Sequence, residues 1–177
     1  SYTCGIMVYN PKEHRIYMHS GRTSGWIAST GGSADAPVEY VQNSDITSNT
    51  EASSFYDISI SDTGRYILSI GNKIYLSRNS GKTFERIDTS ITDWDNDCVA
   101  GDISSDGQYI TLCSRTSGKV FYSSNFGTDW NYVTIDGVSN DLTTVKISKL
   151  GINQIIGGKD GKSYASTNYG QTWVPLP

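Results

Sequence analysis

The chain has 177 residues, enough for one domain that buries about 70% of its unfolded surface in a single core. Aromatic residues make up 11% of the sequence, and no apolar run approaches the roughly 20 residues that cross a bilayer, so the composition argues against disorder and against membrane insertion. The formal net charge is −4, and Lys and Arg are scattered singly. This charge pattern argues against a nucleic-acid partner, because no basic patch could neutralise a phosphate backbone.

The N-terminal part of the chain predicts an incomplete repeat unit. Strands are expected over residues 15–20 and 25–29, and Trp26 takes the place of the aromatic residue of the later repeats. Because the chain begins at Ser1 without an initiating Met, we expect either a removed targeting segment or a domain excised from a longer protein. Residues 31–54 form a long connection, and connections of this length tend to be functional or mobile.

A hairpin pattern follows and recurs along the chain. Residues 57–67 match residues 102–110, and residues 145–151 match both more loosely. The turns at Asp62 and Asp106 contain Asp-Thr-Gly and Asp-Gly, which favour tight turns because Gly adopts positive φ without steric cost.

An octapeptide occurs three times, starting at Ser77, Ser123 and Ser166, with spacings of 46 and 43 residues. A short alternating segment precedes each copy and another begins at its last residue, so each copy is predicted to be a hairpin turn. With the upstream hairpin, each unit holds four short strands in about 45 residues, the period of a β-propeller blade.

The sequence therefore predicts an all-β fold, a small β-propeller of about four four-stranded antiparallel blades, of which the first is incomplete. We expect a single domain over residues 1–177. The expected blades cover about 1–30, 55–90, 98–136 and 143–177, and the long loop covers 31–54.

The octapeptide pattern Ser-x-Asn-x-Gly-x-Thr-Trp resembles the Asp-box, or BNR repeat, of sialidases, sortilin-type receptors and several glycoside hydrolases. All three copies carry Asn where that family usually has Asp, and both side chains accept hydrogen bonds from the backbone of a turn. The resemblance implies that the boxes are structural and lie on the face opposite the ligand site. The residues that carry it are Ser77, Asn79, Gly81, Phe84, Ser123, Asn125, Gly127, Trp130, Ser166, Asn168, Gly170 and Trp173.

The opposite face is expected to carry the ligand, on the connections from each outer strand to the next inner strand. Trp94 offers an apolar platform between Asp93, Asp95 and Asp97, an arrangement that suits a sugar, although Trp94 packed between two blades is an equal alternative. The loop over residues 31–54 adds Glu39 and Tyr40 as rim residues.

Cofactors are not expected, and the sequence contains little material for a metal site. His14 and His19 are the two histidines, and both lie in the first unit. A loose calcium site at Asp93, Asp95 and Asp97 is the alternative to a solvated acidic loop.

Two of the three cysteines, Cys98 and Cys113, flank the turn at Asp106. A regular ladder would place them opposite each other, a geometry that fits a disulfide in an oxidising compartment and equally fits two buried free thiols. Cys4 is left over.

These features favour a non-catalytic recognition module over an enzyme. A sialidase needs three converging arginines and an early Phe-Arg-Ile-Pro element, which is absent here, and no convincing pair of Glu carboxylates can be named for a glycosidase. We therefore expect an extracellular domain, or one on a virion or cell surface, that binds a glycan or a glycoprotein receptor. The alternatives are a sialidase-like glycoside hydrolase or a fragment of one, and a structural interaction domain that completes its ring as a homo-oligomer.

Overall fold

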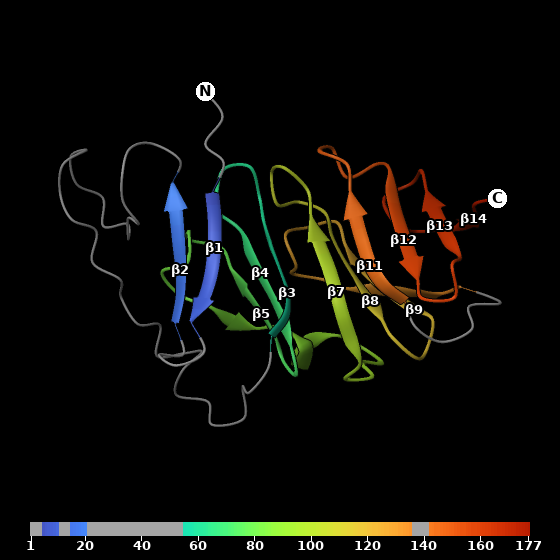
Figure 1. The fold of residues 1–177 in the computed structure, drawn as a ribbon, viewed down its shortest axis with the longest axis horizontal. Helices are drawn as coiled ribbons and strands as arrows, with labels where there is room; N and C mark the ends of the chain where they lie inside the picture. The colour runs from blue at the N-terminus through green and yellow to red at the C-terminus, as the bar shows by residue number, and fades with distance from the viewer. Residues whose placement is uncertain (1–4, 11–14, 21–54, 136–141) are drawn as a thin grey trace. The chain divides into compact units, whose positions relative to one another are not determined.

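The structure is a computed structural model that describes residues 5–10, 15–20, 55–135 and 142–177 (Figure 1). The chain divides into two compact units, Ser1–Ser48 and Asn49–Pro177, and each is described by itself. In the first unit, β1 (Gly5–Asn10) and β2 (Arg15–Ser20) form an antiparallel pair. Several features singled out by the sequence lie outside the described residues: Cys4, His14, Trp26 and the loop over residues 31–54 with Glu39 and Tyr40.

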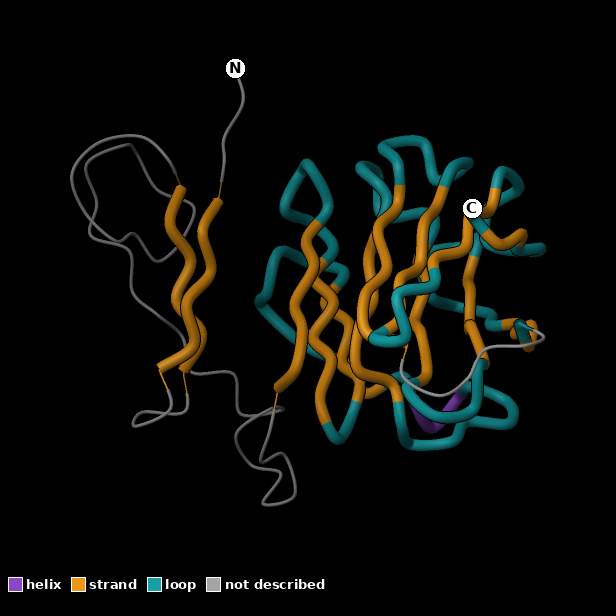
Figure 2. Tube along the Cα trace, turned by 45° about the vertical axis from the view of Figure 1, so that its right-hand side comes forward, coloured by secondary structure: helices purple, strands orange, loops and turns teal. Residues whose placement is uncertain are grey.

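The second unit contains three four-stranded antiparallel sheets, here called blades 2, 3 and 4, and in each of them the strands pair in chain order. Figure 2 shows the strands of this unit in orange, joined by loops and turns in teal. Blade 2 comprises β3 (Phe55–Ile60), β4 (Ile67–Gly71), β5 (Ile74–Ser77) and β6 (Glu85–Arg86). Blade 3 comprises β7 (Cys98–Ile103), β8 (Ile110–Ser114), β9 (Lys119–Ser123) and β10 (Asn131–Thr134). Blade 4 comprises β11 (Leu142–Ile147), β12 (Gln154–Gly158), β13 (Ser163–Ser166) and β14 (Val174–Pro175).

Helical structure is almost absent from the described part of the chain. The one helix found there, η1 (Asp88–Ser90), is a single 3-10 turn between blades 2 and 3. No helix among the described residues is therefore long and apolar enough to cross a membrane. The three sheets confirm the predicted all-β class and the four-stranded antiparallel blade.

The core lies between the sheets, and blade 3 contributes to it on both faces. Successive residues of a strand point to opposite faces, so Leu112 packs in the cluster shared with blade 2, whereas Cys113 packs in the cluster shared with blade 4. In β9, Phe121 packs in the cluster shared with blade 2 and Val120 packs in the cluster shared with blade 4, and both are fully buried. A buried side chain of this size contributes about 1.5–3 kcal/mol by leaving water. The middle blade thus holds its two neighbours together.

The expected cross-strand pairing of Cys98 with Cys113 is wrong, because a β-bulge shifts the register of β7. The strand β7 carries one extra residue at Val99, so Cys98 pairs with Ser114 and Ala100 pairs with Cys113. Cys98 consequently packs in the cluster with blade 2, and Cys113 packs in the cluster with blade 4. Both are buried free thiols.

Two aromatic contacts join successive blades at the tips of their first hairpins. In blade 2, the Tyr66 ring stacks on Phe126 of blade 3, with ring centroids 5.3 Å apart. In blade 3, Tyr109 stacks in the same way on Tyr169 of blade 4, at 4.4 Å. Each tyrosine also covers a turn glycine of the next blade, because an added Cβ at Gly107 would lie 2.1 Å from the Tyr66 ring.

Two aspartates join the first strands of successive blades through hydrogen bonds that their carboxylates accept from the backbone. Asp57 of β3 accepts a hydrogen bond from the backbone N–H of Gly101 in β7, at 3.2 Å. Asp102 of β7 accepts one from the N–H of Ile147 in β11, at 2.8 Å. These carboxylates satisfy backbone donors between sheets, which would otherwise be costly to bury.

Candidate functional site

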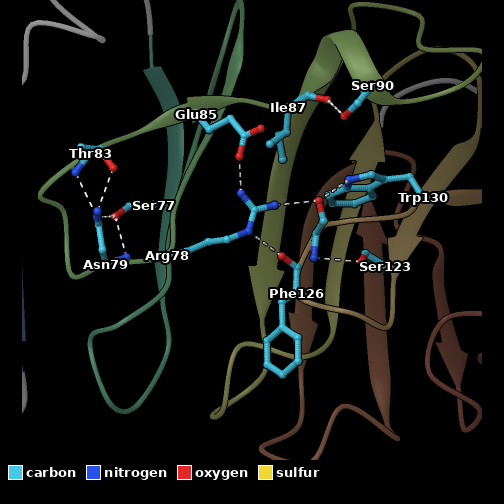
Figure 3. Close-up of polar contacts among 11 residues, drawn as sticks. Ser77, Arg78, Asn79, Thr83, Glu85, Ile87, Ser90, Ser123, Phe126 and Trp130 are labelled. Carbon is cyan, nitrogen blue, oxygen red and sulfur yellow. Dashed lines mark hydrogen bonds and ion pairs between the residues drawn. The ribbon is translucent and has the colours of Figure 1, made fainter.

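The three octapeptides form equivalent turns between the third and fourth strands of blades 2, 3 and 4. In the first copy, Ser77 Oγ accepts a hydrogen bond from the N–H of Gly81 at 2.8 Å. Asn79 Oδ1 accepts one from the N–H of Thr83 at 2.9 Å (Figure 3). The second and third copies repeat both bonds to within 0.2 Å of these lengths. Residue four of each copy has a φ of 60° to 63°, and the Gly that follows is also left-handed. Each turn therefore satisfies its own polar groups.

The first octapeptide also binds the second (Figure 3). Arg78 Nε donates to the carbonyl oxygen of Phe126 at 3.1 Å, and Arg78 Nη2 donates to that of Gly127 at 2.9 Å. Glu85 pairs with the same guanidinium. These contacts give the octapeptide turns a role in holding blades 2 and 3 together.

At the other end of the blades, the predicted acidic loop lies against the turn between β8 and β9. Asp95 accepts hydrogen bonds from the hydroxyls of Ser114 and Ser117. Asp97 accepts them from the N–H and the hydroxyl of Thr116. Both carboxylates therefore hold the loop onto blade 3, a use that the sequence pattern did not indicate.

Asp93 and Trp94 cover the outer part of the same blade. Trp94 is half-buried against the core cluster of blades 2 and 3, with its ring 5.2 Å from that of Phe121. The Asp93 carboxylate accepts a hydrogen bond from the Tyr132 hydroxyl at 2.8 Å, which raises the pKa of Tyr132. The Asp93 carbonyl oxygen accepts a hydrogen bond from Lys119 Nζ at 2.9 Å. Trp94 thus lies in the packed position that was the alternative to a ligand platform.

No group of three or more His, Cys, Asp or Glu side chains in the described ranges is arranged to hold a metal ion. Asp95 and Asp97 are occupied by hydroxyl and N–H donors. A calcium ion at Asp93, Asp95 and Asp97 would have to replace these hydrogen bonds, and the predicted ligand role of the loop stays a prediction.

A second group on this face consists of Tyr56, Asn72 and Arg115, here called the Tyr56 cluster. Tyr56 is 52% exposed at the start of β3, and its hydroxyl donates to Asn72 Oδ1 at 2.8 Å. Arg115, from the turn between β8 and β9, places its guanidinium 5.9 Å from the centre of the Tyr56 ring. No carboxylate in the described part of the chain forms an ion pair with Arg115. The cluster therefore presents an aromatic ring and guanidinium N–H donors to solvent.

Sequence reasoning did not single out the Tyr56 cluster. Its members are 16 and 43 residues apart in the chain, and no motif joins them. The register of β3 shifts between Phe55 and Asp57, so Tyr56 is the extra residue of a β-bulge, and the simple alternation of a regular strand does not mark it.

The sequence matches no protein family, and no curated protein matches it either. Solved structures share its fold. YCF48 bound to D1 peptide is 17% identical, with a TM-score of 0.54 over 69% of this chain and 39% of that chain. YCF48 from Cyanidioschyzon merolae is 16% identical, with a TM-score of 0.53 over 69% of this chain and 36% of that chain. An ancestral GH74 enzyme is 18% identical, with a TM-score of 0.54 over 68% of this chain and 18% of that chain.

This chain therefore matches well under two thirds of the length of each of these structures. At such identities the likeness establishes a β-propeller fold and no activity.

Proposed function

We propose that this chain is a non-catalytic recognition module that binds a glycan or a glycoprotein receptor through the face carrying the Tyr56 cluster. The exposed Tyr56 ring beside a guanidinium that pairs with no carboxylate of the described residues is the observation that carries this proposal. Tyr and Arg combine apolar area with directional donors, and both are enriched where binding energy concentrates. The proposal places the module outside the cell or on a virion or cell surface.

The octapeptide turns support this choice of face. In each turn the Gly N–H donates to Ser Oγ and a later backbone N–H donates to Asn Oδ1, and these bonds support our placing the turns in the Asp-box class. In proteins that the turns resemble, the ligand lies on the opposite face, which here carries Tyr56, Arg115 and the loop over residues 93–97. YCF48, a protein of similar fold, has been solved with a bound peptide, which supports a polypeptide component in the receptor.

The test is binding of the full chain to a glycan array and to candidate glycoproteins, with Tyr56→Ala and Arg115→Ala as variants. We expect each variant to weaken binding at least tenfold, which corresponds to about 1.4 kcal/mol. Tyr169→Ala is the matched control, because it removes a tyrosine from the octapeptide face. Equal loss in the control and in Tyr56→Ala would refute the assignment of the face.

A glycoside hydrolase, or a fragment of one, is the second candidate, supported by the fold shared with the GH74 enzyme. The acidic loop argues for binding over hydrolysis, because Asp95 and Asp97 are committed to holding blade 3. Hydrolysis of a fluorogenic sialoside or of a glucan at enzymatic rates would overturn the recognition proposal in favour of this candidate.

A further inference from the structure

The two junctions between blades 2, 3 and 4 are built from corresponding residues, which allows one to be compared with the other. Phe121 and Tyr164 each lie two residues before an octapeptide, and Lys119 and Lys162 lie four residues before it. Trp130 and Trp173 each end an octapeptide and pack against the core cluster of their junction. Each indole N–H donates to the carbonyl oxygen of the octapeptide Gly, at 3.2 and 3.0 Å.

At the junction of blades 2 and 3, the connection between β6 and β7 packs over Phe121 and Lys119. The segment after β6 supplies the Trp94 ring, which lies 5.2 Å from Phe121, and the Asp93 carbonyl, which accepts from Lys119. Ile91 of the same segment is buried in the junction. An aromatic side chain and an aliphatic one are thus what this surface binds within the molecule.

At the junction of blades 3 and 4, the corresponding surface is an open groove of about 580 Å³. Tyr164 and Trp173 line it where Phe121 and Trp130 stand in the other junction. Val133, Thr134, Lys162 and Gln171 also line the groove. The connection after β10 has the sequence Asp-Gly-Val-Ser-Asn-Asp over residues 136–141, which contains no aromatic residue. The sequence of this connection therefore has no counterpart of Trp94.

We infer that the groove between blades 3 and 4 is a docking site for a partner polypeptide that inserts an aromatic side chain, as Trp94 does between blades 2 and 3. The aromatic lining supplies apolar contact, and aromatic ring pairs are favourable beyond the area that they bury. Thr134 and Gln171 at the rim offer hydroxyl and amide groups to the backbone of the partner. Hot spots of protein interfaces have this composition, an aromatic anchor in a pocket with a polar rim. The site is separate from the Tyr56 cluster.

The probe for this inference is a peptide copied from the chain itself, Ile-Thr-Asp-Trp-Asp-Asn-Asp over residues 91–97. It is titrated, up to about 1 mM, into the isotope-labelled full chain, and amide chemical shifts are followed. We expect saturable shifts at Thr134, Lys162 and Tyr164, and at least tenfold weaker binding of the peptide in which Trp is replaced by Ala. Equal binding of the two peptides, no binding of either, or shifts confined to other residues would overturn the inference.

Two matched variants complete the test. Gln171→Trp places a bulky ring at the rim of the groove, whereas Thr128→Trp places the same ring at the same octapeptide position of the preceding blade. Both residues are exposed, so both variants are expected to fold. We expect Gln171→Trp to weaken peptide binding at least tenfold and Thr128→Trp to leave it unchanged. Equal loss in both would refute the site, and the chemical-shift map of the native chain decides the matter if Gln171→Trp does not fold. Receptor binding at Tyr56 is measured separately, so either proposal can fail alone.

Discussion

The packing of Tyr66 on Gly107 predicts an unusually large effect for a substitution of one methyl group. Gly107 has a φ of 87°, and an Ala Cβ there would lie 2.1 Å from Tyr66 Cδ2 and 2.4 Å from Tyr66 Cγ. Gly161 has a nearly equal φ of 79°, but an added Cβ would meet no atom within 4 Å. Comparing the stability of Gly107→Ala with that of Gly161→Ala therefore separates the cost of a left-handed alanine from the cost of the clash between blades 2 and 3.

The expected magnitudes follow from these geometries. Gly161→Ala should lower the free energy of unfolding by about 1–2 kcal/mol, the cost of a left-handed alanine. Gly107→Ala should add about 1–3 kcal/mol for overpacking, because Tyr66 is 8% exposed and stacked on Phe126 and so has little room to move. For a chain of this length, each kcal/mol lowers the melting temperature by roughly 2–4 °C.

The assay is urea unfolding of the full chain followed by circular dichroism, with thermal melting as a second measurement. The double variant Gly107→Ala with Tyr66→Ala should be less destabilised than the sum of the two single variants, because removing the ring removes the clash. Equal destabilisation by Gly107→Ala and Gly161→Ala would show that Tyr66 does not hold the blades together, and would refute the reasoning.

Three further predictions concern the core and the acidic loop. Trp173→Ala should lower the free energy of unfolding by about 3 kcal/mol, measured by urea unfolding, and an unchanged melting curve would contradict the blade assignment. Asp95→Ala should cost about 1–3 kcal/mol in the same assay, because the buried hydroxyl of Ser114 loses its acceptor; no loss would mean that the loop is held by other contacts. Burial raises the pKa of Cys113 to about 12, and burial also raises the pKa of Cys98. Since an unfolded thiol titrates near about 8.5, stability should fall as the pH rises from about 8.5 toward 12, and the fall should be shallower in Cys113→Ala; an equal slope in both chains would contradict this.

The sequence by itself determined the features that depend on neighbouring residues. Alternation of apolar residues placed the strands, and the glycines of the tight turns and octapeptides placed the hairpins, because positive φ is a local requirement. Three copies of one octapeptide, together with the hairpin pattern that recurs upstream of each, were enough to predict four-stranded blades. The resemblance of that octapeptide to the Asp-box indicated which face would be structural.

The tertiary structure decided everything that depends on register and on contacts between blades. The bulge at Val99 separates Cys98 from Cys113, and no local pattern marks it. The ligand role expected of Asp95 and Asp97 stays a prediction, but their hydrogen bonds to Ser114 and Thr116 arise only when β8 and β9 pair, so the sequence pattern did not indicate them. The groove beside Tyr164 also depends on the tertiary structure, because its lining residues come from β10, β13 and the last octapeptide and meet only after the sheets of blades 3 and 4 have packed.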